Sequence, residues 1–143
     1  MKIRNAFTRS VFTVAVSALA LAAVAIASEP TYNPANTAVV SGAITAVSEV
    51  PAGQPLEGVH VTVQTKTGNV QVYLAPRNFL SFLKTNFAVG DYIDVTGSHV
   101  RSGETDVVLA REVDAGHVSV VLRDPWGAEV WKNWGTRTNL KNT

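Results

Sequence analysis

The sequence contains no cysteine. Without a thiol the chain cannot form a disulfide, carry a lipid on an N-terminal cysteine or use a cysteine nucleophile. Histidine is scarce too, because His60, His99 and His117 stand singly along the chain, with no H-x-H or H-x-x-x-H pair of the kind that favours a metal site. We therefore expect no cofactor and no catalytic residue.

The first residues differ in composition from the rest. Lys2, Arg4 and Arg9 precede an apolar run that ends in Ala-Ile-Ala at Ala27. A basic start, an apolar middle and a small-x-small end are typical of a secretory signal peptide. An uncleaved membrane anchor is the alternative, but the run is near the lower limit for spanning a bilayer. We predict cleavage after residue 27, a periplasmic or secreted protein, and no stable membrane span afterwards.

Basic residues show no excess once this segment is set aside. Residues 28–143 hold nine Lys and Arg against eleven Asp and Glu, a net charge of −2. Proteins that bind nucleic acid usually carry a clustered positive excess, because counterion release supplies most of their non-specific affinity. Export and charge together disfavour a nucleic-acid partner without excluding one.

The remaining chain divides by composition. Residues 28–38 are rich in Pro, Asn, Ser and Thr, which indicates a flexible leader. Residues 39–134 carry the strand patterns and form one predicted domain that ends in an aromatic hairpin, and residues 135–143 form a polar tail.

Strict alternation marks the strongest strand signals. In the stretch 58–76 the residues Val59, Val61 and Val63 fall on one face, which predicts a hairpin with the valines in the core. An apolar helix is expected over 77–87, where its aromatic side chains plug a barrel. The stretch "GDYIDVTGSHV" then predicts a strand. It resembles the fourth strand of many OB-folds, in which a glycine sits at the bend, and the resemblance implies that place for Gly97.

Three strands, a short helix and a closing hairpin are the element order of the OB-fold, a partly open five-stranded Greek-key barrel. An Ig-like sandwich would need about seven strands and no helix in the middle. We therefore predict an all-β OB-fold barrel of five to six strands, with one short helix between the third and fourth.

Five stretches, in order, carry a narrower resemblance: "GVHVTVQTKTG", "VYLAP", "VGDYIDVTGSHV", "LAREV" and "LRDPWGAEVWKNW". With them the chain resembles small exported bacterial OB-fold proteins, and it is similar in size and export signal to periplasmic OB-fold stress proteins. The resemblance implies a binding module. In OB-folds binding commonly uses the second and third strands and the loops beside them.

The polar face of the 58–76 hairpin is the first candidate surface. It presents the side chains opposite the valines, namely His60, Thr62, Gln64, Gln71 and Tyr73. Such a face can stack a ring on the tyrosine and hydrogen-bond through the glutamines. The alternative is a solvated barrel exterior.

Three tryptophans within nine residues are the second candidate feature. Trp126 and Trp134 are expected to contribute to a recognition surface, whereas Trp131 is expected to cover an open end or edge of the barrel. Arg111 and Arg123 are expected to pair with Glu112 or Asp124, the alternative being an anionic ligand.

Three hypotheses of function follow. The first is a non-enzymatic exported binding module that engages an envelope protein or a small ligand. The second is a single-stranded nucleic-acid-binding OB-fold protein, which rests mainly on the common use of the fold. The third is a metal or enzymatic site that joins His60 to His99, where ordinary hydrogen-bonded histidines are the simpler interpretation.

Overall fold

The computed structural model describes residues 28–133. The predicted signal peptide (1–27), Trp134 and the predicted polar tail (135–143) lie outside this range. Six strands, one α-helix and two short 3-10 helices follow one another as η1 Pro34–Asn36, β1 Thr37–Val50, β2 Gly58–Thr65, β3 Gly68–Ala75, α1 Arg77–Phe82, β4 Tyr92–Ser102, β5 Thr105–Ala115, β6 Val118–Val121 and η2 Val130–Asn133.

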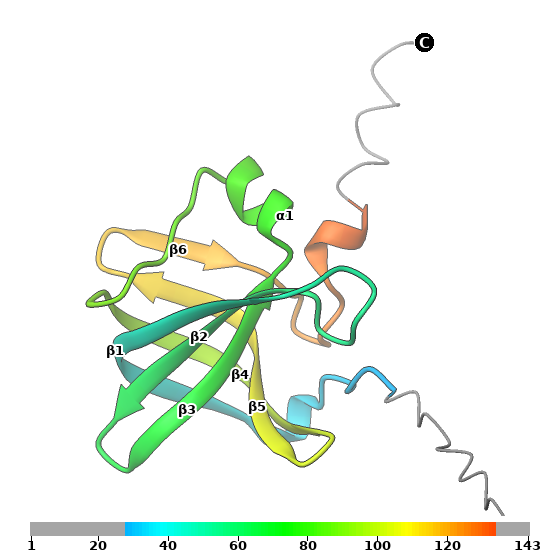
Figure 1. Ribbon diagram of the computed structural model, residues 1–143, viewed down its shortest axis with the longest axis horizontal. Helices are drawn as coiled ribbons and strands as arrows, with labels where there is room; N and C mark the ends of the chain where they lie inside the picture. Colours follow the sequence, from blue (N-terminus) through cyan, green and yellow to red (C-terminus); the bar gives the residue numbers. More distant parts are fainter. Residues whose placement is uncertain (1–27, 134–143) are drawn as a thin grey trace, which may run out of the picture.

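The strands form the predicted OB-fold barrel, with β6 added outside it (Figure 1). Strand order in the sheet is β3-β2-β1-β4-β5-β6, and a parallel pairing of β3 with β5 closes the first five strands. That closing seam consists of the pairs Val72–Val108 and Tyr73–Leu109. The prediction of five to six strands with one helix between the third and fourth is confirmed.

Strand β1 belongs to both sides of the barrel. Its first half pairs with β4 from Thr37 to Ala43, and its second half pairs with β2 from Ala43 to Val50. A shift of register between Ile44 and Ala46 accompanies the change of partner. Irregularities of this kind let a strand bend around a barrel corner.

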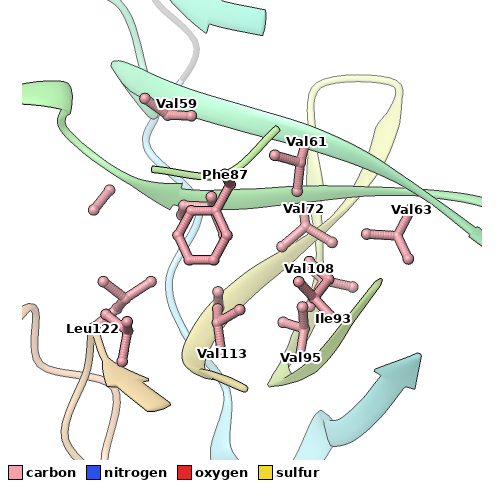
Figure 2. Packing of buried hydrophobic residues seen from close by; sticks show 14 of the residues in the cluster. Val59, Val61, Val63, Val72, Phe87, Ile93, Val95, Val108, Val113 and Leu122 are labelled. Atoms are coloured by element: carbon pink, nitrogen blue, oxygen red, sulfur yellow. The ribbon is translucent and has the colours of Figure 1, made fainter. Parts of the chain in front are cut away.

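The core consists of alternate residues from every barrel strand (Figure 2). Val59, Val61 and Val63 are at most 4% exposed, which confirms the predicted inward face of the hairpin. Phe87 lies among the strand valines in Figure 2, so the segment after α1 contributes an aromatic ring to the core.

The helix is shorter than the 77–87 predicted. α1 ends at Phe82, and Lys84 follows with a φ of 54°. The amides of Lys84 and Thr85 donate to the carbonyl oxygens of Ser81 and Leu80, a Schellman arrangement that stops the helix. Phe79 and Leu80 are buried as expected, but Phe82 is exposed, so only some of the aromatics fill the barrel.

The segment interpreted as a flexible leader packs on the barrel. Strand β1 already begins at Thr37, and Tyr32 is buried. The Ser98 hydroxyl donates a hydrogen bond to the backbone carbonyl oxygen of Asn33 at 2.9 Å and accepts one from the backbone amide of Asn33 at 3.0 Å. The interpretation was drawn from polar composition, which does not register contacts made by one aromatic residue and two hydrogen bonds.

The C-terminal segment differs in one element. We expected a short return strand, but the chain returns as the 3-10 helix η2, and its one ladder contact is an isolated bridge between Arg123 and Glu129. Within the described residues no helix is long and apolar enough to cross a membrane.

Gly97 sits at the bend of β4, as predicted, where the register with β5 shifts. A Cβ atom there would lie 2.4 Å from the carbonyl oxygen of Leu109, which is backbone and cannot move aside. We expect Gly97→Ala to lower the free energy of unfolding by about 2 kcal/mol or more.

Urea denaturation measures this effect, with Gly53→Ala as the control. Gly53 has a positive φ but open space around it, so its replacement adds only local backbone strain of about 1 kcal/mol. Equal losses of unfolding free energy in the two variants would show that the close approach of β5 does not determine the cost of a side chain at Gly97.

Candidate functional site

The chain leaves β6 through a local irregularity that sends Leu122 and Arg123 to opposite sides. The amides of both residues donate to the carbonyl oxygen of Arg111, at 2.7 and 3.1 Å. Leu122 enters the core, while Arg123 lies over the outer face of the barrel and is nevertheless only 2% exposed. A charged side chain is thus buried outside the main core.

Aromatic rings and one carbonyl surround the Arg123 guanidinium. Its Cζ atom lies 5.5 Å from the ring centroid of Tyr73 and 4.9 Å from that of Trp131. Nη1 donates to the carbonyl oxygen of Ala110 at 2.7 Å, and Nη2 lies 3.8 Å from Oε1 of Glu129. Burial lowers the pKa of Arg123, while the Glu129 carboxylate opposes that shift.

The partners predicted for Arg123 are therefore wrong. Asp124 instead accepts the amides of Trp126 and Ala128 on Oδ1, both at 2.9 Å, and so holds the turn. Glu112 accepts the Ser119 hydroxyl at 2.9 Å. The Asp-Pro-Trp-Gly sequence is typical of such an Asx turn.

A groove of about 500 Å³ lies between the leader and the segment that follows β6. We call it the terminal groove; its lining is Glu29, Pro30, Thr31, Tyr32, Leu109, Arg123, Trp126, Gly127, Ala128, Glu129, Lys132 and Asn133. The two walls touch, because a Cβ atom on Gly127 would lie 2.5 Å from the Tyr32 side chain. Segments from both ends of the described chain thus build one surface.

In the terminal groove the Glu129 carboxylate lies near two cations, Lys132 and Arg123, at different distances. Glu129 is 14% exposed and forms a close ion pair with Lys132, whose ammonium reaches Oε2. A hydrogen bond to Glu129 raises the pKa of Lys132. The Glu129 carboxylate is thus bound to Lys132 more closely than to Arg123.

The predicted hairpin face is only partly available to a ligand. Gln64 and Gln71 are exposed, and the Gln71 amide donates to Oγ1 of Thr62 at 2.8 Å. His60 is half-buried, with Nε2 2.8 Å from the carbonyl oxygen of Leu56.

Tyr73 is not available on that face. It is 2% exposed and its hydroxyl donates to the carbonyl oxygen of Glu57 at 2.8 Å. It lies on the side of β3 opposite the valines, as predicted, but His60 and Trp131 cover it, with ring centroids 4.9 and 6.2 Å away. The expectation of an exposed stacking ring is therefore wrong.

The tryptophans occupy different environments. Trp126 is 78% exposed at the terminal groove, whereas Trp131 is partly buried and packs on Tyr73 and Phe79. Trp131 therefore covers the barrel at Tyr73 of β3 and Phe79 of α1, whereas the expectation was an open end or edge. Trp134 lies outside the described residues.

His60 and His99 lie on different strands. His60 on β2 pairs with residues of β1 and β3, and His99 on β4 pairs with Val108 of β5. Over residues 28–133 no group of three or more His, Cys, Asp or Glu side chains is placed to hold a metal ion.

Fold and topology define the class as a small OB-fold barrel with a packed leader and a C-terminal cover. A family model, the MamS/MamX magnetosome protein family, matches residues 36–120. That is more than half of the chain, and the chain belongs to this family. The match ends at Val120, before Arg123 and Trp126. A search of the curated proteins found no match.

Tyr73 provides a test of the cover. Burial raises the pKa of its phenol well above the usual value near 10, although the Arg123 cation opposes the shift. Above about pH 10 the unfolded chain releases this proton while the native chain retains it, so stability falls as pH rises. Tyr73→Phe cannot release a proton.

At pH 7 we expect Tyr73→Phe to lower the free energy of unfolding by about 1 kcal/mol, because the carbonyl oxygen of Glu57 loses its hydrogen-bond donor. The difference in free energy of unfolding between the native protein and the variant should become smaller above about pH 10. Urea denaturation at both pH values measures it; a constant gap would contradict the burial of the phenol.

Proposed function

We propose that this chain is an exported, non-enzymatic OB-fold binding module that engages a protein partner or a small ligand of the cell envelope. The terminal groove carries the proposal, because it combines an open surface, an exposed tryptophan and a buried cation in one place. Pockets that bind ligands commonly pair apolar and aromatic lining with a few placed polar groups.

Two observations support the cell envelope as the place where the protein acts. The first 27 residues carry the pattern of a secretory signal peptide. The chain also belongs to a magnetosome protein family, and that name associates it with a membrane compartment. A periplasmic or secreted protein that works at a membrane compartment fits both.

Exposed Trp126 is the residue through which the proposal is tested. A large apolar side chain that is 78% exposed contributes little to the fold and is suited to contact a partner. We expect a photo-crosslinking amino acid at position 126 to give a discrete crosslinked product in the envelope fraction of the source cells. The mass of the crosslinked chain should show that it begins at Ser28.

The matched control carries the same crosslinker at Lys66, an exposed position between β2 and β3. Products from both positions alike, or from neither, would oppose the groove as a binding surface. A chain that keeps residues 1–27, or stays in the cytosol, would oppose export.

Nucleic-acid binding is the alternative to be separated from this proposal. Two basic residues near the barrel surface are already paired, Arg77 with Glu49 and Arg101 with Asp106. We expect residues 28–143 to leave the anisotropy of a labelled single-stranded oligonucleotide unchanged, both at low salt and at about 0.15 M. Micromolar binding that falls steeply with salt would favour the alternative.

A further inference from the structure

The Arg123 guanidinium has donors that the fold does not use. Within the described range 28–133 its one hydrogen bond is from Nη1 to Ala110, since the 3.8 Å separation from Glu129 is too long for a hydrogen bond. Guanidinium carries five N–H donors in a planar fork. Most of the donors of a side chain that is 2% exposed therefore have no acceptor among residues 28–133.

Those donors reach the terminal groove. Among the described residues no side-chain nitrogen or oxygen is both fully buried and without a hydrogen-bond partner. Nε and Nη2 of Arg123 must therefore retain some access to solvent, and Arg123 is part of the groove lining. An acceptor that enters the groove can take these donors without displacing the bond to Ala110.

The surroundings favour one kind of acceptor. A planar carboxylate matches the guanidinium fork and can accept two parallel hydrogen bonds. The rings of Tyr73 and Trp131 and the burial of Arg123 exclude water from its other sides, which strengthens a charged hydrogen bond. Pro30, Trp126 and Ala128 offer apolar surface beside the same position.

The geometry points to the terminal groove as a binding site for a carboxylate of a partner polypeptide, with Arg123 as its receptor and an apolar neighbour of that carboxylate lying on Trp126. This inference rests on the proposed binding function and names the chemistry of its partner. Glu129 is the internal competitor: its carboxylate already stands 3.8 Å from Nη2, although Lys132 holds it more closely.

The probe is acetyl-alanyl-phenylalanine, with its C-terminal amide as the matched ligand that lacks the carboxylate. Binding to residues 28–143 is followed through the NMR resonance of the Arg123 Nε–H group. We expect the acid to move this resonance saturably and the amide to bind about tenfold more weakly or not at all. Acetyl-glutamyl-phenylalanine amide, a third ligand, tells a side-chain carboxylate from a chain terminus.

Glu129→Gln is the decisive variant, because it removes the competitor and leaves the receptor intact. We expect it to bind the acid several-fold more tightly than the native chain. Glu29→Gln is the control: it removes the same charge from the groove lining, but Glu29 forms no ion pair with Arg123 among the described residues, so its effect should be smaller. Arg123→Lys should lose binding, since an ammonium lacks the fork.

If Arg123→Lys does not fold, the comparison of acid binding by Glu129→Gln and by the native chain decides whether the inference holds. Equal binding of acid and amide, an unmoved Nε–H resonance, or an affinity in Glu129→Gln no higher than in the native chain would each overturn the inference. A crosslink at position 126 that persists in such a case would leave the binding module standing and refute only its carboxylate chemistry.

Discussion

The contact of the buried Arg123 guanidinium with the rings of Tyr73 and Trp131 is the constraint on which the cover of the outer barrel face depends. It holds the segment after β6 against the barrel, since one ring comes from β3 and the other from η2. A buried cation is tolerated when rings and carbonyl dipoles replace part of its hydration. The leader packs on the turn at Gly127, within the segment that this contact holds, so both walls of the terminal groove lie beside it.

The barrel beneath provides a rigid support for that arrangement. β1 pairs with both β2 and β4, and the closing pair of β3 and β5 brings Tyr73 next to Leu109 at the seam. Because successive side chains alternate, β3 directs Val72 into the core and Tyr73 outward. The same strand thus contributes to the main core and to the second cluster of Tyr32, Leu56, Tyr73, Val107 and Leu109.

Period-two patterning was sufficient to predict the inward valines, because these depend on neighbours along one strand, whereas the barrel followed from the order of elements and the bend at Gly97 from the resemblance to OB-folds. The patterning was insufficient for Tyr73, whose outward position was predicted but whose burial depends on Trp131, 58 positions later in the chain. Arg123 was missed as a buried cation for a similar reason: a charged residue after a strand is ordinarily solvated, and no local signal reveals the cover. The burial of Tyr32 likewise depends on contacts that composition does not encode, whereas α1 ends early through a local arrangement of hydrogen bonds at Lys84 and Thr85.

The seam between β3 and β5 consists of two residue pairs, far fewer than join the other barrel strands. Short pairings of this kind open at lower free energy than the rest of a domain. Tyr73 is both a seam residue and one of the two rings that contact Arg123, so one side chain joins the seam to the lining of the groove. A ligand that binds the groove only while the seam is closed would therefore also stabilise the seam, by an amount set by its concentration and affinity.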